Sequence, residues 1–330
     1  MNRRDLITLL GGAAAAWPIA ARAQQPSGMR RIGVLMSYAE SDPDGAVFVA
    51  AFREGLQQLG WAEGRNIRID ARWAGLDTKV MQQFAKELIA LQPDLILSQT
   101  TSTTAALLQQ TRIVPIIFAN VADPVGSGFV ASLPRPGGNV TGFVLSEPTM
   151  AGKWLELLKE VAPHVKRAAL LFNPATAPFA EYFLKPFEAA ALSSRVEAIR
   201  ATARDMPQLE TVIAAQARQP DGGLIVMPDA FLNVHRLDVT SLAARYHLPA
   251  VYPYRFYAEV GGLLSYGNDV LDNYRRAANY ADRILKGAKP SELPVQAPVK
   301  FELVINLKTA KALGLDVPLF LRQRADNVIE

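Results

Sequence analysis

Two stretches of the chain decide its fold: residues 31–37 read RIGVLMS, and residues 167–173 read RAALLFN. Each is a short apolar run that begins at an arginine and ends in a polar loop. Continuous apolarity, without alternation, is typical of strands in a parallel sheet that helices cover on both faces. A segment with helical spacing follows each run, so we predict two similar series of strand–helix units.

Further apolar runs extend each series. They occur at 95–97, 116–118, 224–227 and 250–252, and the intervening segments carry apolar stripes at helical spacing. Asp272 is expected to cap a helix that ends near Gly287. This alternation predicts a doubly wound α/β architecture.

We expect the two series to form two lobes, joined by three hinge crossings. The first lobe is predicted to comprise residues 30–142 and 268–298, and the second lobe residues 148–264 and 303–330. The crossings are expected near 141–148, after a strand at 262–266, and at 301–307.

Composition limits the chemistry. The chain has 330 residues, enough for about two domains, and half of them are hydrophobic. It contains no cysteine, which removes disulfides, thiol catalysis, thiolate zinc sites and a lipid-bearing cysteine anchor. The formal charge of +4 is too small and too dispersed to indicate a nucleic-acid partner.

The first 23 residues have the pattern of a secretory signal peptide. Arg3 and Arg4 precede a short, alanine-rich apolar run, and Ala21-Arg22-Ala23 forms an A-x-A cleavage site. The paired arginines resemble a twin-arginine export signal, and an ordinary secretory signal remains the alternative. With cleavage after Ala23, we expect a soluble, monomeric protein of the periplasm.

A two-lobed α/β protein binds ligands where loops follow the carboxyl ends of its strands. In the first lobe these loops hold Ser37 and Tyr38, and then a hydroxyl-rich segment at 100–104. Hydroxyls and free N–H groups at a helix N-terminus suit a carboxylate. Helix capping is the structural alternative, but one cap uses one hydroxyl, so we assign Thr100, Thr101 and Ser102 to ligand binding.

The loops of the second lobe hold Asn173, Asp229 and Tyr254. Asp229 is a candidate partner for a ligand ammonium group, with a helix N-cap as its alternative role. The tyrosine belongs to an aromatic cluster at 252–257 that could pack against a ring, or else contribute to the core.

Motifs for other functions are missing. There is no dinucleotide-binding glycine loop, no phosphate-binding lysine loop and no nucleophile elbow. The three histidines are far apart, and we identify no catalytic residues, no metal site and no cofactor.

Several blocks, in order, resemble the tryptophan-binding-like substrate-binding proteins of ABC transporters. The matching blocks are GLQQLGW at 55–61, EGRN at 63–66, DPVGSG at 123–128, PGGNVTG at 136–142, GGLLSYG at 261–267 and AKALGL at 310–315. The resemblance implies a type I periplasmic-binding-protein fold that closes on a small solute, often an aromatic amino acid.

Carried over by position, the resemblance implies a specific set of pocket residues. The residues implied are Ser37, Tyr38, Thr101, Ser102 and the loop from Val121 to Asp123 in the first lobe, Asn173, Asp229 and Tyr254 in the second lobe, and Tyr266 and Asp269 at a crossing. The chain departs from many relatives at Pro174, Pro178 and the bulky 254–256 segment, where Arg255 is a candidate partner for an acidic group of a different solute, such as an aromatic acid.

We therefore expect the periplasmic receptor of an ABC importer, with the membrane permease as its partner. Its ligand is expected to be a small carboxylate, such as an aromatic amino acid or a related aromatic acid. A sensory ligand-binding module and a periplasmic enzyme of the same architecture are the alternatives. A repressor is disfavoured because an export signal stands where a DNA-binding domain would be.

Overall fold

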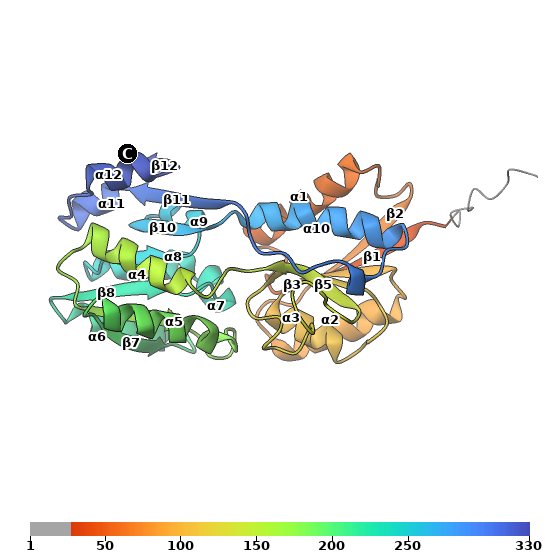
Figure 1. Cartoon of the computed structure of the whole chain (residues 1–330), viewed down its shortest axis with the longest axis horizontal. Helices are drawn as coiled ribbons and strands as arrows, with labels where there is room; N and C mark the ends of the chain where they lie inside the picture. Colours follow the sequence, from red (N-terminus) through yellow and green to blue (C-terminus); the bar gives the residue numbers. More distant parts are fainter. Residues whose placement is uncertain (1–27) are drawn as a thin grey trace, which may run out of the picture.

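The computed structural model describes residues 28–330, which form two lobes side by side (Figure 1). Each lobe is built around one β-sheet with helices on its faces. The prediction of two α/β lobes with parallel sheets is confirmed. The expected signal peptide at 1–23 lies outside the described residues.

The first sheet has five parallel strands in the order β2-β1-β3-β4-β5. Its strands are β1 (Arg30–Met36), β2 (Ile67–Trp73), β3 (Leu95–Thr100), β4 (Ile116–Val121) and β5 (Val140–Val144). Every residue of β4 and β5 is buried, as expected for strands covered on both faces.

The second sheet has seven strands in the order β12-β11-β10-β9-β8-β6-β7. Its strands are β6 (Arg167–Phe172), β7 (Glu197–Thr202), β8 (Gly222–Val226), β9 (Ala250–Tyr252), β10 (Leu264–Asn268), β11 (Phe301–Asn306) and β12 (Asn327–Ile329). Five of these strands, β7-β6-β8-β9-β10, repeat the order of the first sheet. β11 then pairs with β10 in the antiparallel direction.

Helices cover the sheets of both lobes. The helices of the first lobe are α1 (Pro43–Gln58), α2 (Thr78–Ala90), α3 (Thr101–Leu108) and α10 (Val270–Leu285). Those of the second lobe are α4 (Met150–Val161), α5 (Ala180–Ser193), α6 (Met206–Ala217), α7 (Ala230–Val234), α8 (Arg236–Arg245), α9 (Arg255–Glu259), α11 (Leu307–Ala312) and α12 (Leu319–Arg324). A short 3₁₀ turn, η1 (Pro290–Glu292), follows α10.

α10 belongs to the first lobe although it follows eleven strands and helices of the second (Figure 1). It packs against α1, where Gly55 allows a close approach, since a Cβ at that position would lie 2.7 Å from the Cβ of Ala278. The predicted cap of this helix is corrected: Asp269 caps it, accepting hydrogen bonds from the N–H groups of Leu271 and Asp272 at 3.0 and 3.3 Å.

The chain passes between the lobes three times: after β5, after β10 and before β11. The segment 301–307, expected at a crossing, instead forms β11 and the start of α11. Its backbone pairs with β10, and its apolar side chains pack into the core of the second lobe. The crossing therefore lies just before Phe301. These three connections place the carboxyl ends of both sets of parallel strands against a shared cavity.

Candidate functional site

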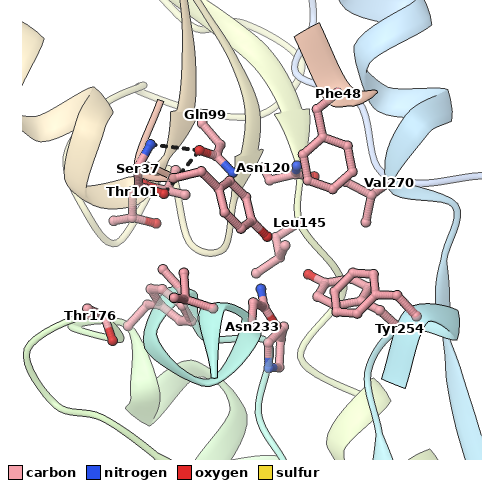
Figure 2. Close-up of a pocket in the computed structure, with 17 residues that line it drawn as sticks. Ser37, Phe48, Gln99, Thr101, Asn120, Leu145, Thr176, Asn233, Tyr254 and Val270 are labelled. Atoms are coloured by element: carbon pink, nitrogen blue, oxygen red, sulfur yellow. Dashed lines mark hydrogen bonds between the residues drawn. The ribbon is translucent and has the colours of Figure 1, made fainter. Parts of the chain in front are cut away.

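An inner cavity of about 40 Å³ lies between the lobes. It is lined by Ser37, Tyr38, Phe48, Gln99, Thr100, Thr101, Asn120, Leu145, Thr176, Phe179, Pro228, Ala230, Asn233, Val234, Tyr254, Phe256 and Val270. Side chains of the two lobes face each other across it (Figure 2). In this arrangement the lobes leave little free space, so they must separate to admit a solute.

The first lobe contributes a polar network at the ends of β1 and β3. The backbone N–H and the hydroxyl of Ser37 both donate to Oε1 of Gln99, at 2.7 and 3.0 Å (Figure 2). Gln99 lies near the end of β3 and Thr101 is the first residue of α3, and both side chains line the cavity. This network positions the start of α3 against the cavity.

Most hydroxyls at the start of α3 bond within the protein. Thr100 and Thr103 form a capping box, and Oγ of Ser98 lies 2.8 Å from the hydroxyls of both Thr103 and Thr104. Thr101 differs: it is 5% exposed, it lines the cavity, and its hydroxyl has no hydrogen-bond partner in the structure. Thr100 also lines the cavity, as a cap residue, and ligand binding by Thr100, Thr101 and Ser102 stays a prediction.

Asp229 lies outside the cavity lining, beneath the loops of the second lobe. Its Oδ2 accepts from the N–H of Asn173 at 2.6 Å, and its Oδ1 accepts from the hydroxyl of Thr176 at 2.5 Å. The same oxygen caps α7 by accepting from the N–H groups of Phe231 and Leu232. Burial raises the pKa of Asp229 to about 6, and these hydrogen bonds partly offset the increase. The structure thus assigns Asp229 the capping role, and its carboxylate joins the ends of β6 and β8.

Aromatic rings form much of the remaining wall. The rings of Tyr38 and Phe48 lie 5.8 Å apart, and those of Tyr254 and Phe256 lie 5.2 Å apart. Burial raises the pKa values of the Tyr38 and Tyr254 phenols well above the ordinary value, so both stay neutral. This wall offers apolar area for a flat ligand.

The other predicted site residues lie outside this lining. Asn173 accepts from the N–H of Ala175 within its own loop, and Asp123 accepts from the N–H of Gly126 in a turn. The ring of Tyr266 packs against Phe301, and Ser102 and Val121 are absent from the lining residues.

An ion pair joins the two lobes. Nη2 of Arg236 in α8 lies 3.1 Å from Oδ2 of Asp44, and its Nη1 lies 4.0 Å from Asp42; both carboxylates are in the first lobe, at the start of α1. The guanidinium also lies 5.7 Å from the ring centre of Phe256. Burial raises the pKa of Asp44, while Arg236 opposes that shift.

An outer cavity of about 410 Å³ adjoins the inner one at the crossings, and it is lined by charged residues. Asp269 and Lys300 pair there at 2.8 Å, and Arg255 pairs with Glu259 and Glu302 at 2.9 and 3.2 Å. Arg255 therefore faces protein carboxylates in the outer cavity and lies outside the inner lining.

Sequence reasoning missed Phe48, Gln99, Asn120 and Asn233 as lining residues, and it named Phe256 only as a member of the aromatic cluster at 252–257. Gln99 could have been found because it lies at the carboxyl end of β3, where ligand-binding loops begin. Asn233 and Phe48 lie inside helices, and only the packing of the lobes brings them to the cavity. Across residues 28–330 there is no cluster of metal-ligating side chains and no helix long and apolar enough to cross a bilayer.

Comparison with known proteins gives consistent similarities. A family model described as ABC transporter substrate binding protein matches residues 40–329. A tyrosine-binding protein of Clostridioides difficile (strain R20291) is 27% identical over 278 residues, which are 84% of this chain and 78% of that protein.

Two solved structures share the arrangement of both lobes. An ABC domain from Streptococcus pneumonia in complex with L-Trp is 26% identical, with a TM-score of 0.84 over 92% of this chain and 100% of that one. A conserved domain protein from Vibrio cholerae is 28% identical, with a TM-score of 0.84 over 91% of this chain and 100% of that one.

Proposed function

This chain belongs to the ABC transporter substrate-binding protein family, and from that premise we propose that it is the solute receptor of an importer. It binds a small, carboxylate-bearing aromatic solute in the inner cavity and presents that solute to the permease. Aromatic amino acids and related aromatic acids are the solute class, and the names of the tyrosine- and tryptophan-binding relatives support it.

One observation carries the carboxylate assignment: the buried hydroxyl of Thr101, without a partner, at the start of α3. A buried polar group without a hydrogen bond is unfavourable, and a ligand atom would satisfy it. The first N–H groups of a helix have no carbonyl partners within the helix, and its dipole favours an anion there. A carboxylate in this position would accept from both kinds of donor.

Closure follows from a ligand that touches both lobes. Its carboxylate would contact Thr101 of the first lobe, and its ring would pack against Tyr254 and Phe256 of the second lobe. Such a ligand binds the closed arrangement better than the open one, so it shifts the population towards closure about the three crossings. The Arg236–Asp44 pair forms only when the lobes meet and adds to the closed state.

We also propose that the protein acts outside the cytoplasm, in the periplasm, after cleavage following Ala23. The sequence pattern of residues 1–23 supports export. N-terminal sequencing of protein recovered from a periplasmic extract is expected to begin at Gln24, and a sequence beginning at Met1 would contradict cleavage.

Calorimetry on protein that has been unfolded and refolded, which strips any ligand carried through purification, tests the solute class. Titrations with aromatic amino acids and aryl-alkanoic acids are expected to give saturable binding for at least one compound. A neutral polyol serves as the control and is expected to give none. Failure of every aromatic compound to bind would overturn the assigned solute class.

A further inference from the structure

The inner cavity carries no formal charge. Its lining residues, all within the described part of the chain, include no Asp, Glu, Lys, Arg or His. A carboxylate can still be held there by the hydroxyl of Thr101 and the start of α3. An ammonium group needs acceptors, and a carboxylate is the strongest that a protein can offer.

The carboxylates nearest the cavity are already engaged. Asp229 receives hydrogen bonds from Asn173, Thr176 and the start of α7, and it lies beneath the lining. Asp42 and Asp44 both face the guanidinium of Arg236. A ligand ammonium would have to compete with the partly buried Arg236 for Asp44, or with the helix cap for Asp229.

The amide oxygens that line the cavity are also engaged. Oε1 of Gln99 accepts twice from Ser37, and Oδ1 of Asn120 accepts from Nδ2 of Asn273 at 3.0 Å. Oδ1 of Asn233 accepts from the hydroxyl of Tyr257 at 3.0 Å. In each side chain the oxygen bonds to protein, and the N–H₂ groups of Gln99 and Asn233 remain as donors for a ligand.

We infer that the natural ligand is an aromatic carboxylate without an α-ammonium group, so that the protein prefers aryl-alkanoic acids to the corresponding amino acids. The inference rests on the proposed function and narrows it. The lining presents donors, namely Thr101, the amides and the start of α3, and its remaining acceptors are neutral hydroxyl oxygens, those of Thr101, Tyr38 and Tyr254. Such a lining matches an anion and offers a buried ammonium no charged partner, which is unfavourable.

Matched ligand pairs test this directly, because each pair differs only in the ammonium group. The pairs are indole-3-propionate with L-tryptophan, 3-(4-hydroxyphenyl)propionate with L-tyrosine, and 3-phenylpropionate with L-phenylalanine. Calorimetry on the refolded protein is expected to give an affinity for the acid about 30-fold or more above that for the amino acid, in every pair that binds.

Equal or tighter binding of the amino acids would overturn the inference and leave the proposed function standing. Binding by no member of any pair would instead overturn the proposed solute class, and the inference with it. The two failures are therefore distinguishable.

The variant Asn233→Asp tests the same point from the protein side. It places a carboxylate in the lining while keeping an oxygen that accepts from Tyr257. Affinity for the amino acid is expected to rise relative to the acid by about tenfold or more. An unchanged ratio, with the melting temperature retained, would contradict the account of the uncharged lining.

Discussion

The first lobe faces the cavity mainly with polar side chains, such as Ser37, Gln99 and Thr101, whereas the second lobe faces it mainly with Phe179, Tyr254 and Phe256. The two sheets nevertheless share one strand order over five strands. The difference arises in the loops and helix starts at the strand ends, which can change without disturbing the sheet. A ligand with one anionic end and one aromatic end would need both lobes.

In the second lobe the hydrogen bonds of Asp229 give it a structural role, and the variant Asp229→Ala tests that role. It leaves several buried donors without an acceptor, so the free energy of unfolding is expected to fall by about 3–4 kcal/mol. Urea denaturation followed by circular dichroism measures this. Unchanged stability combined with lost ligand affinity would show that Asp229 contacts the ligand.

The pH dependence of stability sharpens the same point. Burial raises the pKa of Asp229 to about 6 from an ordinary value of 3.8. Between these values the folded protein binds more protons than the unfolded chain. The contribution of Asp229 protonation to the free energy of unfolding is therefore complete below about pH 4 and is lost as the pH rises through about 6. Its size is about 3 kcal/mol, because one pKa unit corresponds to about 1.4 kcal/mol.

Urea denaturation at several pH values, on the wild type and on Asp229→Asn, isolates this titration. The stability of the wild type relative to the variant is expected to decrease between pH 4 and pH 7. A difference that stays constant or increases over this range would contradict the raised pKa.

On the polar side, Thr101→Val tests the carboxylate contact. Valine keeps the shape and removes a hydroxyl that has no protein partner, so stability is expected to hold while ligand affinity falls by about 2 kcal/mol, or about 30-fold. Calorimetry with the best aromatic carboxylate measures the change.

Thr103→Val is the matched control for that variant. Its hydroxyl serves the helix cap, so the expected loss is in stability, about 1 kcal/mol, with little change in affinity. If Thr101→Val bound the ligand as tightly as the wild type, the first lobe would not hold the carboxylate as proposed.

The smallest expected effect comes from the contact between the lobes. Arg236→Gln removes the ion pair with Asp44, and ligand affinity is expected to fall by about 1 kcal/mol because the closed state loses a partly buried pair. Arg245→Gln, which removes an exposed pair with Glu210 within the second lobe, is the control and should leave affinity unchanged. Equal affinities in both variants would exclude a role for Arg236 in closure.

The sequence predicts the central strands of both sheets because burial on both faces requires continuous apolar runs, as at 31–37 and 167–173. Edge strands lack this pattern. β7 has several exposed side chains, so no apolar run marks it. The segment 301–307, which forms β11 between β12 and β10, is predicted as a crossing because nothing local shows that it pairs with β10. Asp269, not Asp272, caps α10, an uncertainty of one turn that pattern alone does not resolve.

The candidate site was predictable where a strand runs directly into its loop, as at Ser37, Tyr38, Thr101 and Tyr254. Which hydroxyl of 100–104 stays unpaired depends on the bonds among Ser98, Thr103 and Thr104. The contributions of Asn233 and Phe48 depend on how two lobes meet, which no local pattern encodes. Asp229 was predicted from its chemistry, since a carboxylate suits a ligand ammonium. In the structure its oxygens already accept hydrogen bonds from the start of α7 and from the Asn173 loop.

The central claim is that one solute bridges both lobes and closes them, and a distance between the lobes tests it most directly. The chain has no cysteine, so Ile113→Cys in the first lobe and Leu192→Cys in the second, at positions 87% and 82% exposed, introduce the sole attachment sites for spin labels. Pulsed electron–electron double resonance is expected to show a broad distance distribution without ligand, and a shorter, narrower one with saturating indole-3-propionate. A distribution unchanged by a ligand that calorimetry shows to be bound would contradict the account.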